Sequence, residues 1–302
     1  MTPRVSIVVP TYNRAQDLER ALRSAQAQTF TAWEAVVVDN HSSDDTDEII
    51  RSLDDARIRL FKIHNHGVIA ASRNLGIQQS LGQFVAFLDS DDWWSPRKLE
   101  EAIVALDGGA DVVHHDLFVA VKSRQRYHHR RSKGRQLDSP VFEDLLANGN
   151  ALPNSSVVVR RELLQQVGGL CEEPSLIALE DFDTWLRIAT LTDRFAYIPQ
   201  VLGYYWLGGG NMTNPRRTLQ ALAALEARHA EGFSRLRAVG GCYWLLYARG
   251  RAHYSLRASG QAVCQLRQLP WRTTPWPVAV KAAWMLAISR LRLMSGLDRA
   301  EA

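Results

Sequence analysis

The first 120 residues alternate apolar, β-branched segments with segments of helical spacing, and this alternation restricts the fold more than any other feature. The apolar segments predict strands at 5–9, 35–38, 58–63, 84–88 and 111–115. Helices are predicted between them, over 14–28, through Ile49–Leu53, over 69–80 and after Pro96. We expect Asn13 to cap the first helix and Ser42–Asp44 to cap the second. This alternation of strands and helices indicates an α/β fold with a mostly parallel sheet flanked by helices.

The composition is that of a globular protein. The 302 residues are 46% hydrophobic and 23% charged, which excludes disordered and fibrous classes and suits a catalytic domain with a smaller appendage. The cysteines Cys171, Cys242 and Cys264 form no CxxC pair, which argues against a disulfide scaffold or a zinc knuckle and favours a reducing compartment. No signal peptide and no simple membrane span are expected.

Polar residues follow three of the predicted strands at their carboxyl ends, where sheets of this kind bind ligands. They are Pro10–Arg14, Asp39 and Asp89-Ser90-Asp91-Asp92. Acidic residues after strands can simply cap helices, but three carboxylates within four residues repel one another. A divalent cation with oxygen ligands offsets that repulsion, so the sequence predicts a Mn²⁺ or Mg²⁺ site here.

Several familiar site motifs are missing. The sequence has no GxxxxGK[ST], no GxGxxG after a strand, no HExxH and no GxSxG. A metal site without a P-loop lysine points to a nucleotide diphosphate whose charge is shared with basic side chains. Arg73 is a candidate for that charge, and its alternative is an exposed helix residue.

An ordered set of motifs spans about residues 3–214. Its members are Val5–Arg14, Val37–Asp44, Asn65-His66-Gly67, Arg73–Gly76, Phe87–Asp92, Pro153–Leu170 and Glu180–Arg187. In order and spacing they resemble the family 2 inverting glycosyltransferases, which have the nucleotide-sugar-binding fold called GT-A. The resemblance implies a GT-A catalytic domain over 1–214, with a nucleotide-sugar half to about 118 and an acceptor half from about 119. Residues 215–302 would form a helical extension.

The resemblance also assigns roles to residues. The nucleotide would be held by Pro10, Thr11, Tyr12, Arg14, Asn65, Gly67, Arg73, Asp89, Ser90 and Asp39, the last accepting from a uracil N3–H. Gly67 would let the backbone approach closely. Asp91, with Asp89, would bind the metal in a DXD motif. Asp181, paired with Glu180, would be the general base that takes a proton from the acceptor hydroxyl. The alternative for this acidic pair is a stabilising position at a helix N-terminus.

Two departures from the family pattern bear on the reaction. Many relatives carry Tyr-Arg-x-His near the end of the domain, but Tyr205–Thr213 lacks the Arg and the His, so the third metal ligand is unassigned and the glycines predict a mobile loop. Nothing resembles the Gln-x-x-Arg-Trp motif of processive synthases, which favours transfer of a single sugar.

Two other polar stretches have less defined roles. His114 and His115 are adjacent on a predicted strand and point to opposite faces, so a structural or acceptor-side role is favoured over a shared metal. Lys122–Arg135 holds seven Lys or Arg and no acid. It is predicted to be a solvated loop, where an anionic acceptor or lipid headgroup could dock.

The last 88 residues are basic, with 14 Lys or Arg against four Asp or Glu. One helix is predicted at 217–236, one or two over 242–269 and one at 278–297, and Trp271, Trp276 and Trp284 lie close together. Tryptophan beside basic residues is typical of a helix that lies at a membrane interface. The alternatives are a solvated helical face or aromatics that pack on the catalytic domain.

These observations favour a metal-dependent inverting glycosyltransferase that moves one sugar from a nucleotide-sugar donor, a UDP-sugar, to a saccharide or lipid-linked acceptor in cell-surface polysaccharide synthesis. We expect it in the cytoplasm, peripheral at the inner face of the membrane, with a possible anionic membrane surface but no nucleic acid as partner. One alternative is a sugar nucleotidyltransferase. Such an enzyme would carry a Gly-rich first loop, and Pro10–Arg14 is not Gly-rich. The other is a catalytically inactive nucleotide-sugar-binding protein.

Overall fold

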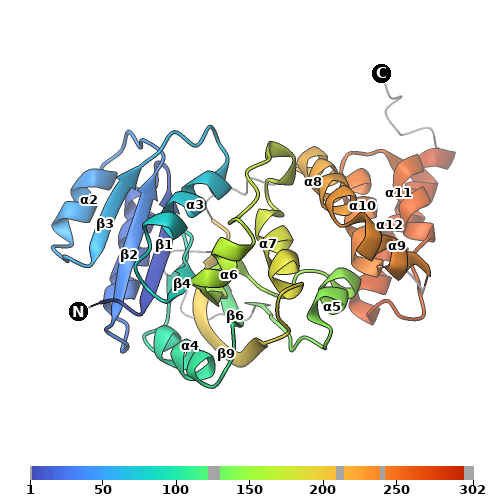
Figure 1. The fold of residues 1–302 in the computed structure, drawn as a ribbon. Coiled ribbons are helices and arrows are strands. Elements are labelled where there is room, and N and C mark those ends of the chain that lie inside the picture. The colour runs from blue at the N-terminus through green and yellow to red at the C-terminus, as the bar shows by residue number, and fades with distance from the viewer. Residues whose placement is uncertain (1, 122–129, 209–213, 239–241, 296–302) are drawn as a thin grey trace. The chain divides into compact units, whose positions relative to one another are not determined.

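A computed structural model describes residues 2–121, 130–208, 214–238 and 242–295 (Figure 1). The chain divides into two compact units. Unit 1 comprises residues 1–141, 151–172 and 180–211. Unit 2 comprises 142–150, 173–179 and 212–302, so it takes two earlier segments as well as the C-terminal residues. The predicted boundary at 214 and 215 stays a prediction.

Unit 1 is built on a nine-stranded sheet with the order β3-β2-β1-β4-β8-β6-β9-β5, in which β7 pairs with β6. The strands are β1 Val5–Thr11, β2 Trp33–Asp39, β3 Ile58–Lys62, β4 Phe84–Phe87, β5 Trp93–Trp94, β6 Val112–Ala120, β7 Arg131–Ser132, β8 Val158–Arg160 and β9 Phe195–Trp206. Strands β3, β2, β1 and β4 are parallel, as are β6 and β9, whereas the other pairs are antiparallel. The predicted α/β fold class is confirmed, and its parallel part is the N-terminal half.

Helices cover both faces of the parallel strands. They are α1 Ala15–Gln26, α2 Thr46–Ser52, α3 Ile69–Gln79, α4 Lys98–Asp107, α6 Arg161–Gln166 and α7 Glu180–Ala189, with a short 3-10 helix at Asn154–Ser156. Ile7 of β1 packs in one core with Leu18 of α1 and Leu99 of α4. On the opposite face α3 lies so close that a Cβ added at Gly76 would be 2.5 Å from Val8 Cγ1. Strands buried on both faces explain the continuous apolar segments of the sequence.

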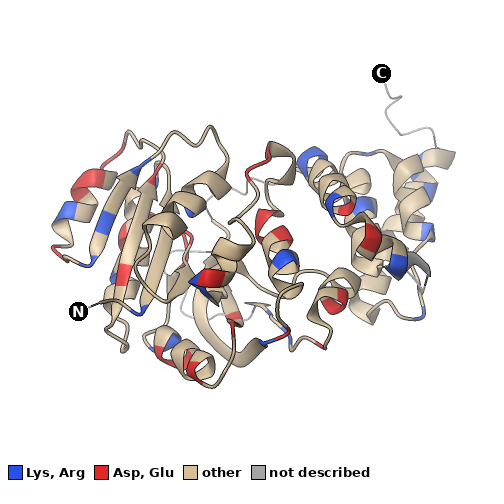
Figure 2. Cartoon of the chain, viewed as in Figure 1, with Lys and Arg blue, Asp and Glu red and all other residues tan. Residues whose placement is uncertain are grey.

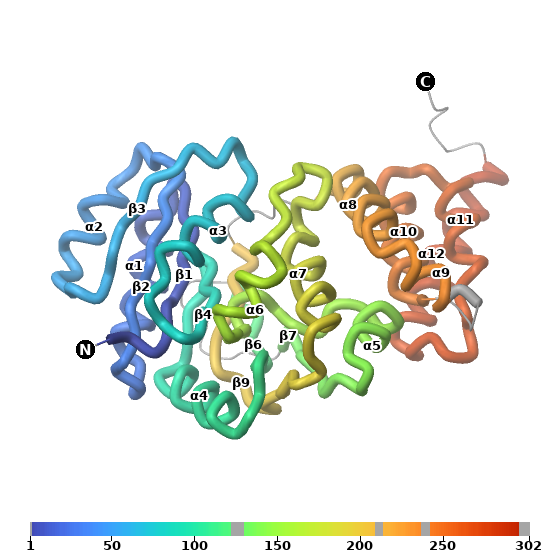
Figure 3. The backbone as a smooth tube through the Cα atoms, viewed as in Figure 1, coloured from blue at the N-terminus to red at the C-terminus, as the bar shows by residue number. Residues whose placement is uncertain are grey.

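Unit 2 is helical. It contains α5 Val141–Asn148 (from Phe142 onward), the 3-10 helix Pro174–Leu176, α8 Pro215–Arg228, α9 Ala230–Ala238, α10 Tyr243–Ser255, α11 Ser259–Arg267 and α12 Trp276–Met294 (Figure 3). The predicted helix at 217–236 is divided into α8 and α9, and of the two alternatives for 242–269 the structure has two helices. Trp244 donates from Nε1 to the carbonyl of Leu146 at 2.7 Å, which joins α10 to α5 in the segment 142–150. No helix in the described residues has the length and apolar character needed to cross a bilayer.

Candidate active site

The carboxyl ends of β1, β2 and β4 meet at one edge of the sheet. Thr11 pairs in register with Asp39 on the neighbouring strand, and Asp89 follows β4 by two residues. Thr11 is buried, and its hydroxyl has no hydrogen-bond partner within the described residues. Because a buried hydroxyl without a partner is costly, this side chain is suited to accept or donate to a ligand at the edge.

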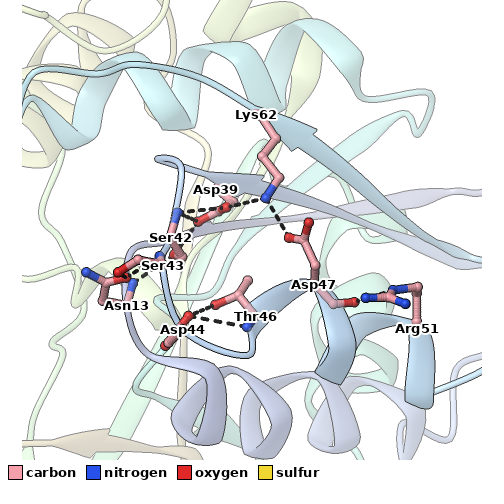
Figure 4. Close-up of polar contacts among 9 residues, drawn as sticks. All are labelled: Asn13, Asp39, Ser42, Ser43, Asp44, Thr46, Asp47, Arg51 and Lys62. Carbon is pink, nitrogen blue, oxygen red and sulfur yellow. Dashed lines mark hydrogen bonds and ion pairs between the residues drawn. The ribbon is translucent and has the colours of Figure 1, made fainter.

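Asp39 is fully buried and anchored from two sides (Figure 4). Its carboxylate accepts from the Ser42 N–H at 3.1 Å and from the Ser42 hydroxyl, and it pairs with Lys62 Nζ at 3.0 Å. Lys62 also pairs with Asp47, and the hydrogen bond that Lys62 donates to Asp47 is the main cause of a raised Lys62 pKa. Sequence analysis missed Lys62, although it ends the strand next to β2.

The loop after β1 is tied to the loop after β2. Asn13 has a φ of +50° and accepts through Oδ1 from the Ser43 N–H at 2.8 Å (Figure 4). The prediction that Asn13 caps α1 is therefore wrong. Asp44 hydrogen-bonds to the start of α1 instead. Its carboxylate accepts from the N–H of Ala15 at 2.9 Å and also from that of Thr46 at 3.3 Å. One carboxylate thus fixes the first turns of α1 and α2, as expected for residues 42–44.

Asn65 and Gly67 form a turn beside this edge. Asn65 donates from its N–H to Asn40 Oδ1 and accepts from the Gly67 N–H, both at 2.9 Å. Gly67 has a φ of +82°, which L side chains rarely adopt, but a Cβ there would have no atom within 4 Å. The glycine is therefore explained by backbone conformation. The close approach of this backbone to a nucleotide stays a prediction.

The acidic segment after β4 places its carboxylates in different surroundings. Asp89 and Asp91 have side chains 26% and 27% exposed, whereas Asp92 is buried. Burial and repulsion by Asp89 raise the pKa of Asp91 to about 6, and Arg14 at 3.3 Å opposes the shift. Asp92 accepts from the Trp206 N–H at 2.8 Å and so holds β9. Asp89 and Asp91 are the members of this cluster that a ligand can reach.

Arg73 connects this cluster to the start of α7. Its guanidinium pairs with Asp89 at 2.7 Å and with Glu180 at 2.6 Å, and the residue is only 4% exposed. Burial lowers the pKa of Arg73, but the two carboxylates outweigh it and the net shift is upward. The alternative that Arg73 is an exposed helix residue is wrong. The cation joins residues 91 positions apart along the chain, at Asp89 and Glu180.

Asp181 lies next to this ion pair at the first turn of α7. Burial, and then repulsion by Glu180, raise its pKa to about 7, while Arg73 lowers it. Its Oδ1 accepts from the Phe182 N–H at 2.7 Å. A carboxylate poised near neutral pH is suited to take a proton from a substrate.

Further residues at the edge were missed by sequence analysis. Burial raises the pKa of Tyr205 to about 12, with further contributions from Asp92, Asp89, Asp91 and Asp181, so Tyr205 lies near all four carboxylates. Arg20 donates to the Asp91 carbonyl at 2.7 Å, and its guanidinium lies 4.2 Å from the centre of the Trp93 ring. Of these residues, only Tyr205 could have been found from the sequence, because it begins the segment that corresponds to Tyr-Arg-x-His in relatives. Residues 209–213 of that segment are outside the described residues.

His114 and His115 are fully buried and hydrogen-bonded to backbone carbonyls of Arg135 and Asp116. Burial lowers their pKa values to about 4 and about 3. A structural role is the interpretation that these contacts support. Of the predicted basic loop 122–135, residues 122–129 lie outside the described residues. In the described parts, no group of three or more His, Cys, Asp or Glu is arranged to hold an ion.

Comparison with known proteins gives a family for the chain. The model of glycosyl transferase family 2 matches residues 6–168. The chain belongs to glycosyltransferase family 2. An uncharacterized glycosyltransferase of Nostoc sp. is 33% identical over 237 residues, which are 76% of this chain and 72% of that protein. The family supports a glycosyltransferase activity for the chain, and most of the sheet edge described above lies inside the matched range.

Other relatives and solved structures are similar over different spans. The UDP-Glc:alpha-D-GlcNAc-diphosphoundecaprenol beta-1,3-glucosyltransferase WfgD of Escherichia coli is 38% identical over 99 residues, 33% of this chain and 39% of that one. S. aureus TarS in complex with UDP-GlcNAc has a TM-score of 0.62 at 19% identity, over 97% of this chain and 92% of that chain. A Pyrobaculum calidifontis mannosyltransferase with GDP-Man and Mn²⁺ has a TM-score of 0.56 at 20% identity, over 96% and 81%. These two structures show that the fold is GT-A.

Proposed function

We propose that this family 2 glycosyltransferase is a metal-dependent, inverting enzyme that transfers a single sugar from a UDP-sugar to a saccharide or lipid-linked acceptor. The observation that carries the proposal is the buried Arg73, which pairs with Asp89 on the donor side and with Glu180 beside Asp181. Through this cation the groups that would hold the donor and the group that would deprotonate the acceptor belong to one network.

The donor would lie along the edge formed by β1, β2 and β4. Asp39, which Ser42 and Lys62 hold in place, would accept from the base, and the buried Thr11 hydroxyl would bond to the nucleoside. Pro10, Tyr12, Arg14, Asn65, Gly67 and Ser90 would complete the nucleotide site. The E. coli relative and the TarS complex both carry a uridine nucleotide-sugar in their names, which supports UDP over other nucleotides.

The metal site would use Asp91 and Asp89. The residues fit a Mn²⁺ or Mg²⁺ ion, because both carboxylates are partly exposed and the Asp91 pKa is raised by burial and then by repulsion from Asp89. A cation between them would relieve that repulsion, and the Mn²⁺ in the P. calidifontis structure supports the assignment. When bound, such an ion stabilises negative charge on the departing nucleotide diphosphate. Arg14, 3.3 Å from Asp91, adds positive charge at the same place.

Asp181 would act as the general base. An inverting displacement needs one base and no protein nucleophile, and Asp181 has a pKa of about 7, near the operating pH. Glu180 is less suited, because its Oε1 is bound to Arg73 at 2.6 Å. We therefore assign proton removal to Asp181 and positioning of Arg73 to Glu180.

The acceptor would be lipid-linked, and the reaction would serve cell-surface polysaccharide synthesis at the cytoplasmic face of a membrane, with the enzyme peripheral to it. The E. coli relative supports this, because its name gives a diphosphoundecaprenol-linked acceptor. No observation favours the sugar nucleotidyltransferase alternative.

Two assays test the proposal. Calorimetry with UDP, GDP and CDP in Mn²⁺ should give the tightest binding for UDP. Product analysis should show release of UDP from a UDP-sugar in the presence of diphosphoundecaprenol-linked saccharides, and no UDP-sugar from sugar-1-phosphate and UTP. Tight UDP binding without any transfer across these acceptors would instead support the inactive nucleotide-sugar-binding protein.

A further inference from the structure

Helix α12 has two apolar faces, and only one of them is buried. Ala282, Met285 and Ser289 are buried, and Ala282 and Met285 form a small core with Leu266 and Leu269. Six further apolar residues recur at intervals of three and four, which places them in one stripe along the helix: Trp276, Val280, Trp284, Ala287, Leu291 and Met294. The buried positions lie on the opposite side of the helix from this stripe.

The stripe is exposed along its length. Trp276 is 78% exposed and Met294 85%, and Val280, Trp284 and Leu291 are each 59–60% exposed. A helix of this length extends about 28 Å. Isolated exposed apolar residues are ordinary, but a continuous stripe with two tryptophans indicates a surface that binds something. The helix packs in unit 2 mainly through its other face, and from the stripe the Trp284 ring lies 5.7 Å from the Tyr254 ring of α10.

The charges around the stripe are of one sign. Lys281 and Arg290 fall on its two borders, and Arg292 lies over the Tyr254 ring on the packed side. From residue 232 to residue 297 the sequence holds ten Lys or Arg and no Asp or Glu, so α10, α11 and α12 carry only positive charge (Figure 2). The partner of this surface must therefore be negatively charged and must accept apolar side chains.

We propose that the exposed stripe of α12 is a docking surface for an anionic lipid bilayer, in which the helix lies parallel to the membrane plane. Tryptophan and aliphatic side chains would enter the boundary between headgroups and acyl chains, while Lys281 and Arg290 reach the phosphates from its borders. The inference rests on the peripheral location in the proposed function and gives it a defined surface. A second copy of the chain is a poor occupant, because pairing two such faces brings cations of the same sign together.

The test is flotation of the full chain with vesicles of phosphatidylcholine alone or mixed with an equal part of phosphatidylglycerol, at low and high salt. Wild-type protein should bind the anionic vesicles at low salt and dissociate at high salt. Lys281→Gln/Arg290→Gln should weaken partitioning about 30-fold at low salt, since each cation near such a surface contributes about 1 kcal/mol. Trp276→Gln/Trp284→Gln should also weaken partitioning at low salt, by about tenfold or more.

Matched controls come from exposed positions of unit 1. Arg23→Gln/Arg97→Gln removes the same charge, and Leu81→Gln/Val104→Gln removes exposed apolar side chains. Neither control should change partitioning. The melting temperature of each variant checks that the fold is intact, and Trp276→Gln alone avoids loss of the ring contact between Trp284 and Tyr254.

Two results would overturn the inference. One is equal flotation of the wild type and the stripe variants. The other is a wild type that does not bind vesicles but forms dimers, with the dimers lost in the tryptophan variant. Measuring UDP binding in the same samples separates the two hypotheses. Wild-type protein that binds UDP but not the anionic vesicles contradicts the docking surface alone. Wild-type protein that does not bind UDP contradicts the proposed function.

Discussion

The sheet edge of unit 1 and helix α12 of unit 2 use charge and apolar surface in opposite ways. At the sheet edge, charged side chains are buried or half-buried and paired with opposite charges, as Arg73 is with Asp89 and Glu180. On α12 the tryptophans are exposed, and the cations at the borders of the stripe have no carboxylate near them in sequence. Burying paired charges is expensive and retained where their geometry matters, whereas exposing apolar surface is retained where a partner covers it. The comparison therefore supports the proposals of chemistry for one region and of docking for the other.

Replacing the base should have the largest effect. Asp181→Asn keeps the shape of the side chain and removes its basicity, so the rate of sugar transfer should fall about 10²–10⁴-fold while UDP affinity stays within about twofold. Initial rates and calorimetry measure the two quantities. Glu19→Gln on α1 is a control that removes a carboxylate from the surface and should leave both unchanged. If Glu180→Gln loses transfer and Asp181→Asn does not, the roles within the pair are reversed.

Removing the metal ligand should come next. Asp91→Ala should weaken Mn²⁺-dependent UDP binding about 100-fold, because the ion loses one of its two protein carboxylates. Binding of UDP in the presence of a chelator should be nearly equal in variant and wild type. Affinity with Mn²⁺ that is unchanged by the substitution would contradict the metal assignment. Circular dichroism checks that the fold is intact.

The pH dependence of transfer follows from the raised pKa of Asp181. A carboxyl group with a pKa of about 7 is protonated below that pH and cannot accept a proton, so the rate should fall about tenfold per pH unit below 7 and level off above it. The residual activity of Asp181→Asn should lack this inflection. A wild-type profile that is flat from pH 5 to pH 8 would mean that no group with this pKa limits the reaction.

The smallest effect is expected at Lys62, which is a third exposed and orients the buried Asp39. Lys62→Gln should weaken UDP binding about fivefold, or about 1 kcal/mol, because Asp39 loses one of its two anchors. Arg51→Gln on α2 removes a nearby exposed cation that does not touch Asp39, and it should bind UDP normally. An increase in affinity for Lys62→Gln would show that Lys62 competes with the base for Asp39.

Sequence patterns predicted the parallel half of the sheet well, because strands buried on both faces leave continuous apolar runs that end in polar residues. The same patterns singled out Asp39, Asp89 and Asp91, since each lies at or just after the end of a strand, whereas Asp181 was singled out by the resemblance to family 2. They missed β5, whose two residues are too few for any periodicity. They also missed Lys62 and Arg20, because those side chains reach the site only through tertiary packing that no local pattern encodes.

Helix α12 was located by its spacing, but its orientation could not be predicted. Apolar residues recur on two sides of this helix, and spacing alone does not tell which side packs inward. The structure decides it through the burial of Ala282 and Met285 and the exposure of Trp276 and Trp284. The Asn13 cap was wrong for a related reason. A capping residue can hydrogen-bond to a loop that is distant in sequence, here Ser43, in place of the helix that follows it.

The most direct measurement of the central claim is the anomeric configuration of the first product. The chain would be mixed with UDP-glucose or UDP-GlcNAc, Mn²⁺ and a diphosphoundecaprenol-linked saccharide, and the new linkage followed by proton NMR. The sugar in these donors is α-linked, so a single displacement assisted by Asp181 gives a β-linked product that Asp181→Asn does not form at a comparable rate. An α-linked product, or equal rates for wild type and Asp181→Asn, would contradict the account.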